Sequence, residues 1–356
     1  MLDVAALFDQ VVARDASDLH LRVGQVPRIR IHGELLPATG LAAAGAADLE
    51  ALLEQSVHAG HRQQFETHGE VDCACHGPGG SRYRANWFRD CNGIAASFRR
   101  IPDQVRSIRE LGMPEELEEL AKIRHGLVLV TGATGSGKSS TLAALIDRIN
   151  RDHARHIVTL EDPVEFVHVP IKSLIRQREV GEDVPDFAAG VRDALRADVD
   201  VLLVGELRDL ETTRAALTAA ETGILVFGTL HTNDAAQTVD RLIDVFPVAE
   251  QDPVRAMLAP SLAAVVSQIL MRRADGQGRV AATELMLATP AIQALIREGR
   301  SNDIPNFLQS GREAGMWRMD DSITRLMKLG TISIDEAQGS LRQRGRVDRR
   351  PLPSAS

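Results

Sequence analysis

One short stretch of the chain carries glycines, a lysine and hydroxyl side chains in an order suited to holding phosphate groups. The glycines of such a loop let backbone N–H groups turn inward around phosphate oxygens, and a following helix points its positive end at the same place. We expect Lys138 to reach the β and γ phosphates of a nucleotide and Ser139 to hold Mg²⁺. The stretch fits GxxxxGK[ST] and consists of Gly132, Ala133, Thr134, Gly135, Ser136, Gly137, Lys138 and Ser139, followed by Ser140.

A carboxylate follows the apolar run in VDVLLVGELRD, residues 199–209. Glu206 comes directly after the predicted strand 201–204, at the edge where ligands bind in open α/β sheets. An acid at this place can orient or deprotonate an attacking water, or hold Mg²⁺ through water. Alone it is a weak signal. Next to a phosphate-loop pattern it is the main candidate for the catalytic residue.

Two other predicted strands end in polar groups. TLEDPVEF places Glu161, Asp162 and Glu165 after one of them, where they serve a metal or a water, or are solvated carboxylates at a strand exit. His231 ends the strand in GTLHTNDAAQ, where it either hydrogen-bonds a γ-phosphate or is a structural histidine. The residues alone leave both alternatives open.

Basic residues cluster in the first third of the chain. A positive group must stabilise the charge on a transferring phosphoryl group, and it often comes from a neighbouring subunit. On charge alone, an exposed strand face is the better interpretation of this cluster, which consists of Arg82, Arg84, Arg99 and Arg100.

Length and composition limit the function classes. With 356 residues and 44% apolar residues, the chain is long enough for two domains with real cores. Its net charge of −8 disfavours general binding to nucleic acid. It has no apolar run near the roughly 20 residues that span a bilayer, and no basic N-terminal region typical of a signal peptide. Three cysteines favour a reducing, cytosolic compartment, and Cys73 and Cys75 are interpreted as buried strand residues rather than metal ligands.

The pattern of predicted helices and strands changes along the chain. The first third reads as a small α+β domain, with helices over 2–13 and 47–66 and strands between and after them. Apolar runs at 127–130, 156–161, 199–206 and 224–231 then alternate with helices, which favours a parallel sheet with crossover helices. After about residue 285 the chain turns helical. The predicted parts are 1–101, a linker 102–114, an ATPase core 115–285, C-terminal helices 286–342 and a disordered tail 343–356.

Together these stretches resemble a known superfamily. GATGSGKSST, TLEDPVEFVH, VLLVGELRD and the segment from Thr218 to Pro247 are similar, in order and spacing, to the Walker A, Asp box, Walker B and His box of the secretion and type IV pilus ATPases. The first third, with ASDLHLRVGQVPRIRIHGELLP and SRYRANWF, resembles the N-terminal domain of that superfamily. The likeness runs from about residue 15 to about residue 340.

Within the superfamily the chain resembles the PilT-like retraction ATPases of twitching motility. It begins directly with the small domain, and Gln268 to Val280 carries no cysteine of the zinc insertion of extension and type II secretion ATPases. ATPAIQALIRE is similar to the helix of the retraction family that contains AIRNLIRE, with Gln293 and Ala294 at the positions of its Arg and Asn. The first His-box histidine of the family corresponds to Ile224.

The resemblance implies a fold and an activity. It implies an α/β, RecA-like P-loop ATPase domain, a smaller PAS-like α+β N-terminal domain and a homohexamer that hydrolyses ATP with Mg²⁺. ATP would lie between the two domains of one chain, with Arg82, Arg84 and Arg99 facing its phosphates. Glu206 would be the catalytic carboxylate and would hold Mg²⁺ together with Ser139. His231 would sense the γ-phosphate. Glu161 and Glu165 would assist with water or metal.

The implied work is type IV pilus retraction at the cytoplasmic side of the inner membrane. The implied partners are an inner-membrane pilus platform protein and a paralogous pilus ATPase, and no nucleic acid. Four alternatives stay open: an extension or type II secretion ATPase, an accessory retraction paralogue, a nucleic-acid translocase and a nucleotide-binding scaffold that does not hydrolyse.

Overall fold

The structure is a computed structural model that describes residues 2–31, 33–77, 80–102 and 104–343. The chain groups into two compact units. The first consists of Met1–Val105, Leu160–Val169 and Gln177–Gly190, and the second of Arg106–Thr159, Pro170–Arg176 and Val191–Ser356. The domain bounds given above remain predictions, and all of the predicted tail after residue 343 lies outside the described residues.

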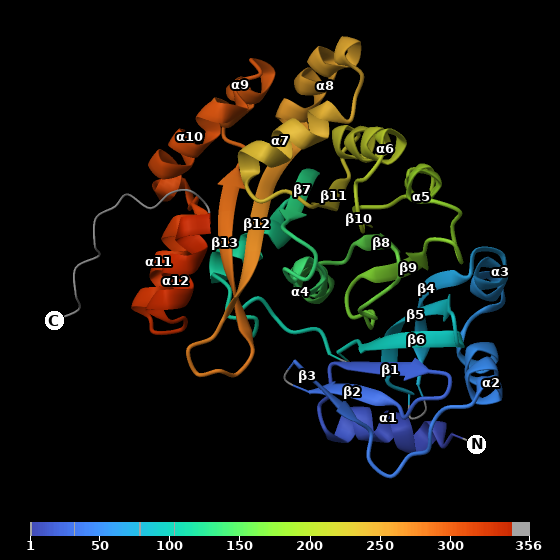
Figure 1. Cartoon of the computed structure of the whole chain (residues 1–356). Coiled ribbons are helices and arrows are strands. Elements are labelled where there is room, and N and C mark those ends of the chain that lie inside the picture. Colours follow the sequence, from blue (N-terminus) through green and yellow to red (C-terminus); the bar gives the residue numbers. More distant parts are fainter. Residues whose placement is uncertain (1, 32, 78–79, 103, 344–356) are drawn as a thin grey trace. The chain divides into compact units, whose positions relative to one another are not determined.

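The first unit contains a six-stranded sheet in the order β3-β2-β1-β6-β5-β4, with antiparallel neighbours (Figure 1). Its strands are β1 (Asp18–Arg22), β2 (Arg28–Ile31), β3 (Glu34–Pro37), β4 (Glu70–His76), β5 (Arg82–Asp90) and β6 (Gly93–Arg100). Its helices are α1 (Val4–Ala13), α2 (Ala46–Ser56) and α3 (Ala59–His68).

Alternation along the strands gives this sheet one apolar face. In β5 every second residue from Tyr83 to Trp87 is buried, and Cys73 and Cys75 are buried in the same way in β4, as predicted. Helix α1 adds Phe8, whose ring meets Tyr83 edge-on at 4.8 Å between centroids. The strand residues between the buried ones, such as Arg84, therefore lie on the polar face of the sheet.

The predicted helix over 47–66 is two helices. Helix α2 ends at Ser56, and α3 begins at Ala59. Val57 adopts extended angles and is 4% exposed, so burying its β-branched side chain in the core interrupts the helix. A helical hydrophobic pattern continues through this point, which is why the sequence did not reveal the break.

The second unit is built on a seven-stranded sheet in the order β13-β12-β7-β11-β10-β8-β9. Strands β12, β7, β11 and β10 are parallel neighbours, and β13 pairs antiparallel with β12. The strands are β7 (Gly126–Thr131), β8 (His156–Glu161), β9 (Leu174–Glu179), β10 (Val201–Val204), β11 (Leu225–Leu230), β12 (Leu262–Arg272) and β13 (Arg279–Leu287). The α/β class and the four predicted strands are confirmed, whereas β9, β12 and β13 were not predicted.

Helices cover both faces of this sheet. Helix α4 lies on one side, and α5 and α6 lie on the other (Figure 1). Strands β7, β10 and β11 are buried at every position, which explains their continuous apolar runs. The helices of this part are η2 (Glu115–Lys122), α4 (Lys138–Asp152), α5 (Phe187–Ala194), α6 (Leu210–Glu221), α7 (Ala235–Asp244) and α8 (Val248–Ser261).

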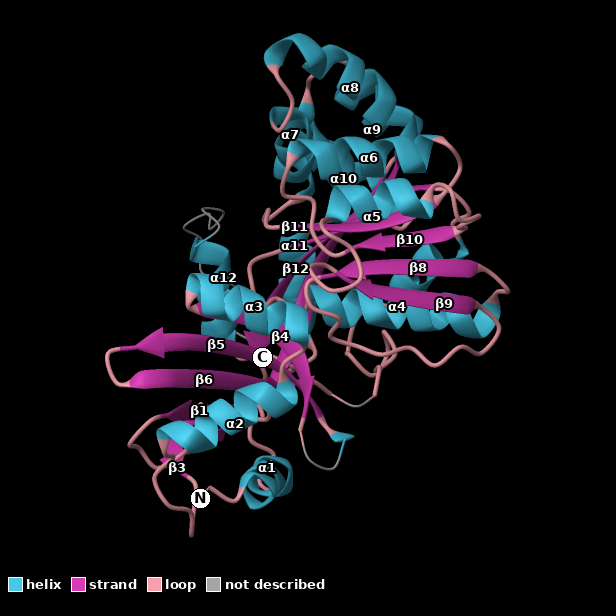
Figure 2. Cartoon of the chain, turned by 90° about the vertical axis from the view of Figure 1, so that its right-hand side faces the viewer, coloured by secondary structure: helices cyan, strands magenta, loops and turns pink. Residues whose placement is uncertain are grey.

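The described residues after β13 form the predicted group of helices (Figure 2). Thr289 caps the first of them by accepting a hydrogen bond from the N–H of Ile292, with Pro290 at its first position. Among the described residues, no helix has the length and apolar character needed to cross a membrane. The elements are α9 (Pro290–Arg297), η3 (Ser301–Asp303), α10 (Ile304–Ser310), η4 (Gly311–Ala314), α11 (Met319–Lys328) and α12 (Ile334–Gln343).

Candidate functional site: a phosphate loop and an acidic residue at one sheet edge

The phosphate-loop pattern connects β7 to α4, as its residue types require. Gly132 has φ 144°, and a Cβ there would lie 2.3 Å from the carbonyl oxygen of Gln268. Gly135 and Gly137 also have positive φ, at 77° and 90°. Side chains at these positions would be strained or would collide, so glycine alone allows the loop to fold this tightly.

The start of the helix after the loop is suited to an anion. No side chain caps α4, whose N-cap is Gly137, so the first N–H groups of the helix keep no capping partner from a side chain. The Lys138 ammonium curls back over the loop and donates to the carbonyl oxygens of Gly132 and Ala133, at 2.8 and 3.2 Å. Ser139 is exposed at the start of the helix. These features fit a nucleotide phosphate, since N–H groups, a lysine and a helix N-terminus converge on one loop.

The loop is held by a residue that the sequence analysis did not identify. Gln268 of β12 is 1% exposed. Its amide donates to the carbonyl oxygen of Ser136 at 2.6 Å and accepts from the Thr141 hydroxyl at 2.9 Å. One strand residue thus fixes both the loop and the first turn of α4. Two polar residues, Ser267 and Gln268, inside the apolar run AAVVSQILM were the available signal.

Glu206 and His231 lie at the ends of neighbouring strands. Strand β11 pairs with β7 so that Leu230 faces Thr131, and it pairs with β10 so that Gly228 faces Val204. The residues that follow these strand ends therefore share the sheet edge of the phosphate loop.

A carboxylate with two basic partners forms at this edge. Oε1 of Glu206 lies 3.1 Å from Nε2 of His231 and 2.7 Å from Nε of Arg208. Glu206 is largely buried, at 19% side-chain exposure, while Arg208 is 69% exposed. The structure therefore brings Glu206 and His231 together in the second unit and pairs Arg208 with Glu206. Lys138 lies in the phosphate loop at the same edge of the sheet.

The partners decide the charge of Glu206. Burial acts to raise the pKa of this carboxyl, but the hydrogen bond and charge of Arg208, together with His231, outweigh it and hold the pKa below its ordinary value. Glu206 is therefore an ionised carboxylate at neutral pH, able to accept a hydrogen bond or a proton from water.

The first unit contains the other candidates. Arg82 donates to the carbonyl oxygens of Val164 and Glu165, at 3.0 and 3.3 Å. Arg84 holds Asp72 through two nitrogens and lies 3.5 Å from the Glu165 carboxylate. The hydrogen bond with Asp72 raises the pKa of the guanidinium, against an opposing effect of burial.

Two predicted candidates make separate contacts in this unit. Glu161 accepts a hydrogen bond from the side chain of Gln177 at 3.2 Å. Arg99 pairs with Asp18 at 3.0 Å and is 72% exposed. Arg82 and Arg84 thus reach the acidic loop 162–165, whereas Arg99 pairs with an acid of its own sheet.

These features define a P-loop nucleotide-binding protein with an acid at the same edge of the sheet. Residues 91–314 match the family model of type II/IV secretion system proteins. Over 95% of the chain and 97% of the relative, it is 46% identical to the type IV pilus retraction ATPase PilT of Pseudomonas aeruginosa. It is 47% identical to a twitching motility protein of Neisseria gonorrhoeae, over 88% of this chain and 83% of that one.

A solved structure is similar over nearly the whole chain. The crystal structure of the pilus retraction motor PilT with bound ADP superposes with a TM-score of 0.89 at 39% identity, covering 98% of this chain and all of that one. The chain therefore belongs to the type II/IV secretion system protein family and, within it, to the PilT-like ATPases. The resemblance read from the motifs is confirmed.

Proposed function

We propose that this chain is a motor ATPase that hydrolyses ATP to power type IV pilus retraction. The observation that carries the chemical part is the ionised Glu206, held between His231 and Arg208 at the strand edge of the phosphate loop. An acid at this place can orient and deprotonate the water that attacks the terminal phosphate.

Each proposed site residue of the second unit has a role that fits its position. Residues Gly132 to Ser140 wrap the phosphates with backbone N–H groups. Lys138 exchanges its contacts with the Gly132 and Ala133 carbonyl oxygens for phosphate oxygens. His231 is within hydrogen-bond distance of Glu206, so a γ-phosphate that draws the imidazole also changes the environment of the base.

Ser139 and Glu206 are the residues that would hold Mg²⁺. The Ser139 hydroxyl is exposed at the first turn of α4, and Glu206 supplies a carboxylate that reaches a metal through water. When bound, this ion neutralises charge on the β and γ phosphates. The donor set of hydroxyl, carboxylate and water oxygens is the kind that Mg²⁺ prefers.

We also propose that the first-unit arginines stabilise the phosphoryl group during transfer. Arg82 and Arg84 now donate to the 164–165 segment and to Asp72, so they must exchange these partners to act on a phosphate. Glu161 and Glu165 would assist with water or metal. Arg99, which is paired with Asp18, completes the proposed set.

The biological part of the proposal rests on the relatives. Two similar proteins are named for pilus retraction and twitching motility. We propose that six copies form a ring on the cytoplasmic side of the inner membrane and act on a pilus platform protein, together with a paralogous pilus ATPase. The proposed domain division follows the sequence bounds, with a PAS-like part over 1–101 and an ATPase part over 115–342.

A deletion strain tests this function. Cells without the protein are expected to carry excess surface pili and to lose twitching, and a plasmid copy restores both, whereas a Glu206→Gln copy does not. Bald cells would show an extension or secretion motor instead. Normal pili and twitching would contradict retraction as the main role and leave an accessory paralogue.

A further inference from the structure

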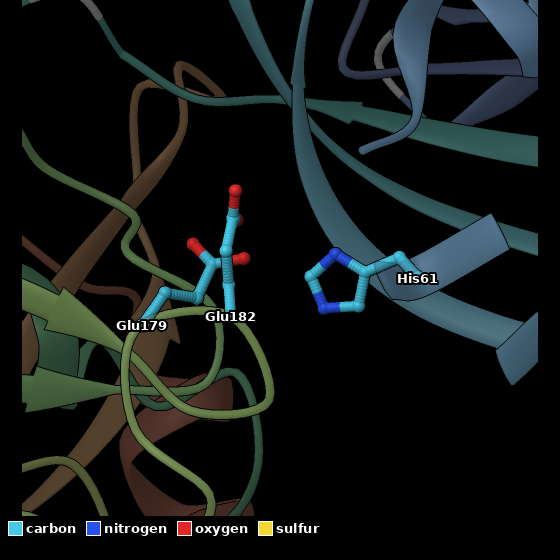
Figure 3. Close-up of side chains that lie close together, drawn as sticks. All are labelled: His61, Glu179 and Glu182. Atoms are coloured by element: carbon cyan, nitrogen blue, oxygen red, sulfur yellow. The ribbon is translucent and has the colours of Figure 1, made fainter. Parts of the chain in front are cut away.

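A histidine and two glutamates lie together in the first unit. They are His61 of α3, Glu179 at the end of β9 and Glu182 in the following turn. One ligand atom from each lies within 4.8 Å of the others. Figure 3 shows the imidazole of His61 aimed at the two carboxylates from the opposite side.

His61 is a buried residue, and its imidazole faces the two carboxylates. The residue is 5% exposed. A ring that faces two carboxylates but is too far away for an ion pair leaves room for a group that bonds to all three.

The backbone holds the two glutamates in place. In the turn after β9, the N–H of Asp183 donates to the Glu179 carbonyl oxygen at 2.8 Å, and the Asp183 carboxylate accepts from the Glu179 N–H at 2.8 Å. Gly181 has φ 85°, and a Cβ there would lie 3.7 Å from Nε2 of His61. A tight turn thus presents both carboxylates to the ring.

The electrostatics of the cluster favour an added positive charge. Glu179 is 7% exposed, and its burial raises the pKa of its carboxyl. The hydrogen bond from the Val164 N–H lowers this pKa, and the nearby Glu182 carboxylate raises it. The buried carboxylate of Glu179 and the exposed carboxylate of Glu182 lie near one another, and a cation between them would relieve their repulsion. His58 meets Glu182 at 3.3 Å on the exposed side, so the cluster is open to solvent there.

We propose that His61, Glu179 and Glu182 bind a divalent transition-metal ion, with Zn²⁺ the best match. One imidazole nitrogen and two carboxylate oxygens are ordinary zinc ligands, at about 2.0–2.2 Å from the ion. Donors on one ion are therefore at most about 4.2 Å apart, which small side-chain movements achieve from the present geometry. Water, or His58, takes the fourth position.

Such an ion would stabilise the acidic loop of the first unit. The cluster already contacts this loop, because Oε2 of Glu179 accepts a hydrogen bond from the Val164 N–H at 3.0 Å. The N–H of Val180 donates to the Glu161 carbonyl oxygen at 2.9 Å. Bound metal would thus tie helix α3 to the segment that carries Glu161 and Glu165, independently of nucleotide.

Calorimetry with zinc chloride alone tests the proposal. The full-length chain is stripped of metal by a chelator and titrated without nucleotide, so that the phosphate loop does not compete. We expect one saturable Zn²⁺ per chain, with affinity lowered by about tenfold or more in His61→Gln and in Glu182→Gln. His68→Gln and Glu66→Gln, at exposed positions of the same helix, serve as matched controls and should bind like the wild type.

X-ray absorption at the zinc edge provides a second readout. The proposal expects nitrogen and oxygen scatterers and no sulfur, since Cys73 and Cys75 are outside the ligand set. Absence of saturable binding to the wild type would overturn the proposal. Binding unchanged in both variants, or sulfur in the spectrum, would overturn it as well. Because Glu182 is exposed, Glu182→Gln should keep the fold, which a thermal melt verifies.

Discussion

Nε2 of His231 lies 3.1 Å from Oε1 of Glu206, although the two residues belong to different strand ends. The parallel pairing of β10 with β11 creates this contact. It links the residue proposed to detect the terminal phosphate with the residue proposed to activate water. Arg208, at 2.7 Å from the same oxygen, is the third member of the group.

Replacing Arg208 should move the pH dependence of hydrolysis. The Arg208 contact helps to hold the pKa of Glu206 below its ordinary value, so the base stays ionised as the pH falls. In Arg208→Ala the pKa rises, and the acid limb of kcat/KM should move to higher pH. Arg192→Ala, which removes an exposed pair with Glu211, is the control. An unchanged profile would refute the assigned role of Arg208.

Gln268 should matter to nucleotide binding without touching the nucleotide. Gln268→Leu removes the donor to the buried Ser136 carbonyl oxygen and one acceptor of the Thr141 hydroxyl. We expect the free energy of unfolding to fall by about 1–3 kcal/mol and ATP to bind more weakly, because the loop loses its support. Denaturant melts and equilibrium binding measure the two effects.

The matched control for this variant is Gln277→Leu, an exposed residue of the β12–β13 connection. It should change neither stability nor affinity. If Gln268→Leu bound ATP like the wild type, the loop would not depend on β12.

The glycines of the loop should differ sharply in their tolerance of alanine. A Cβ at Gly132 would lie 2.3 Å from a backbone oxygen, whereas a Cβ at Gly135 has nothing within 4 Å. Gly135→Ala is therefore expected to cost about 1–2 kcal/mol of backbone strain, from its positive φ. Gly132→Ala should cost clearly more, because β12 must also move. Equal stability of the two variants in urea would contradict the loop geometry.

The phosphate loop, Glu206 and His231 could be predicted because short local patterns carry them. Strand, glycine loop and helix follow one another directly, and the strand ends are marked by polar residues after apolar runs. Gln268 could not be found in this way, since its partner Ser136 is 132 residues away and only the pairing of β12 with β7 brings them together. The meeting of His61 with Glu179 and Glu182 is hidden for the same reason.

Two fold details also depended on tertiary structure. The break at Val57 arises because the core takes up this side chain, and the helical pattern on either side conceals it. Strands β12 and β13 extend the sheet beyond the predicted parallel strands, and their long apolar runs do not distinguish a strand from a buried helix.

A substitution of Arg84 can distinguish a catalytic role of this arginine from a purely structural one. Arg84→Ala should lower kcat by about 10³-fold if the guanidinium stabilises the transferring phosphoryl group, while ATP affinity stays close to that of the wild type. Arg28→Ala, at an exposed position of β2, is the control. If Arg84 serves only to hold Asp72 and Glu165, the melting temperature falls and kcat does not.

Phosphate release by Glu206→Gln, measured together with ATP binding, is the most direct test of the central claim. The amide keeps the shape of the side chain but cannot accept a proton from water. We expect ATP affinity near that of the wild type and a rate lower by about 10²–10⁴-fold, with Glu211→Gln on the exposed start of α6 unchanged. A Glu206→Gln chain that releases phosphate at the wild-type rate would contradict the account.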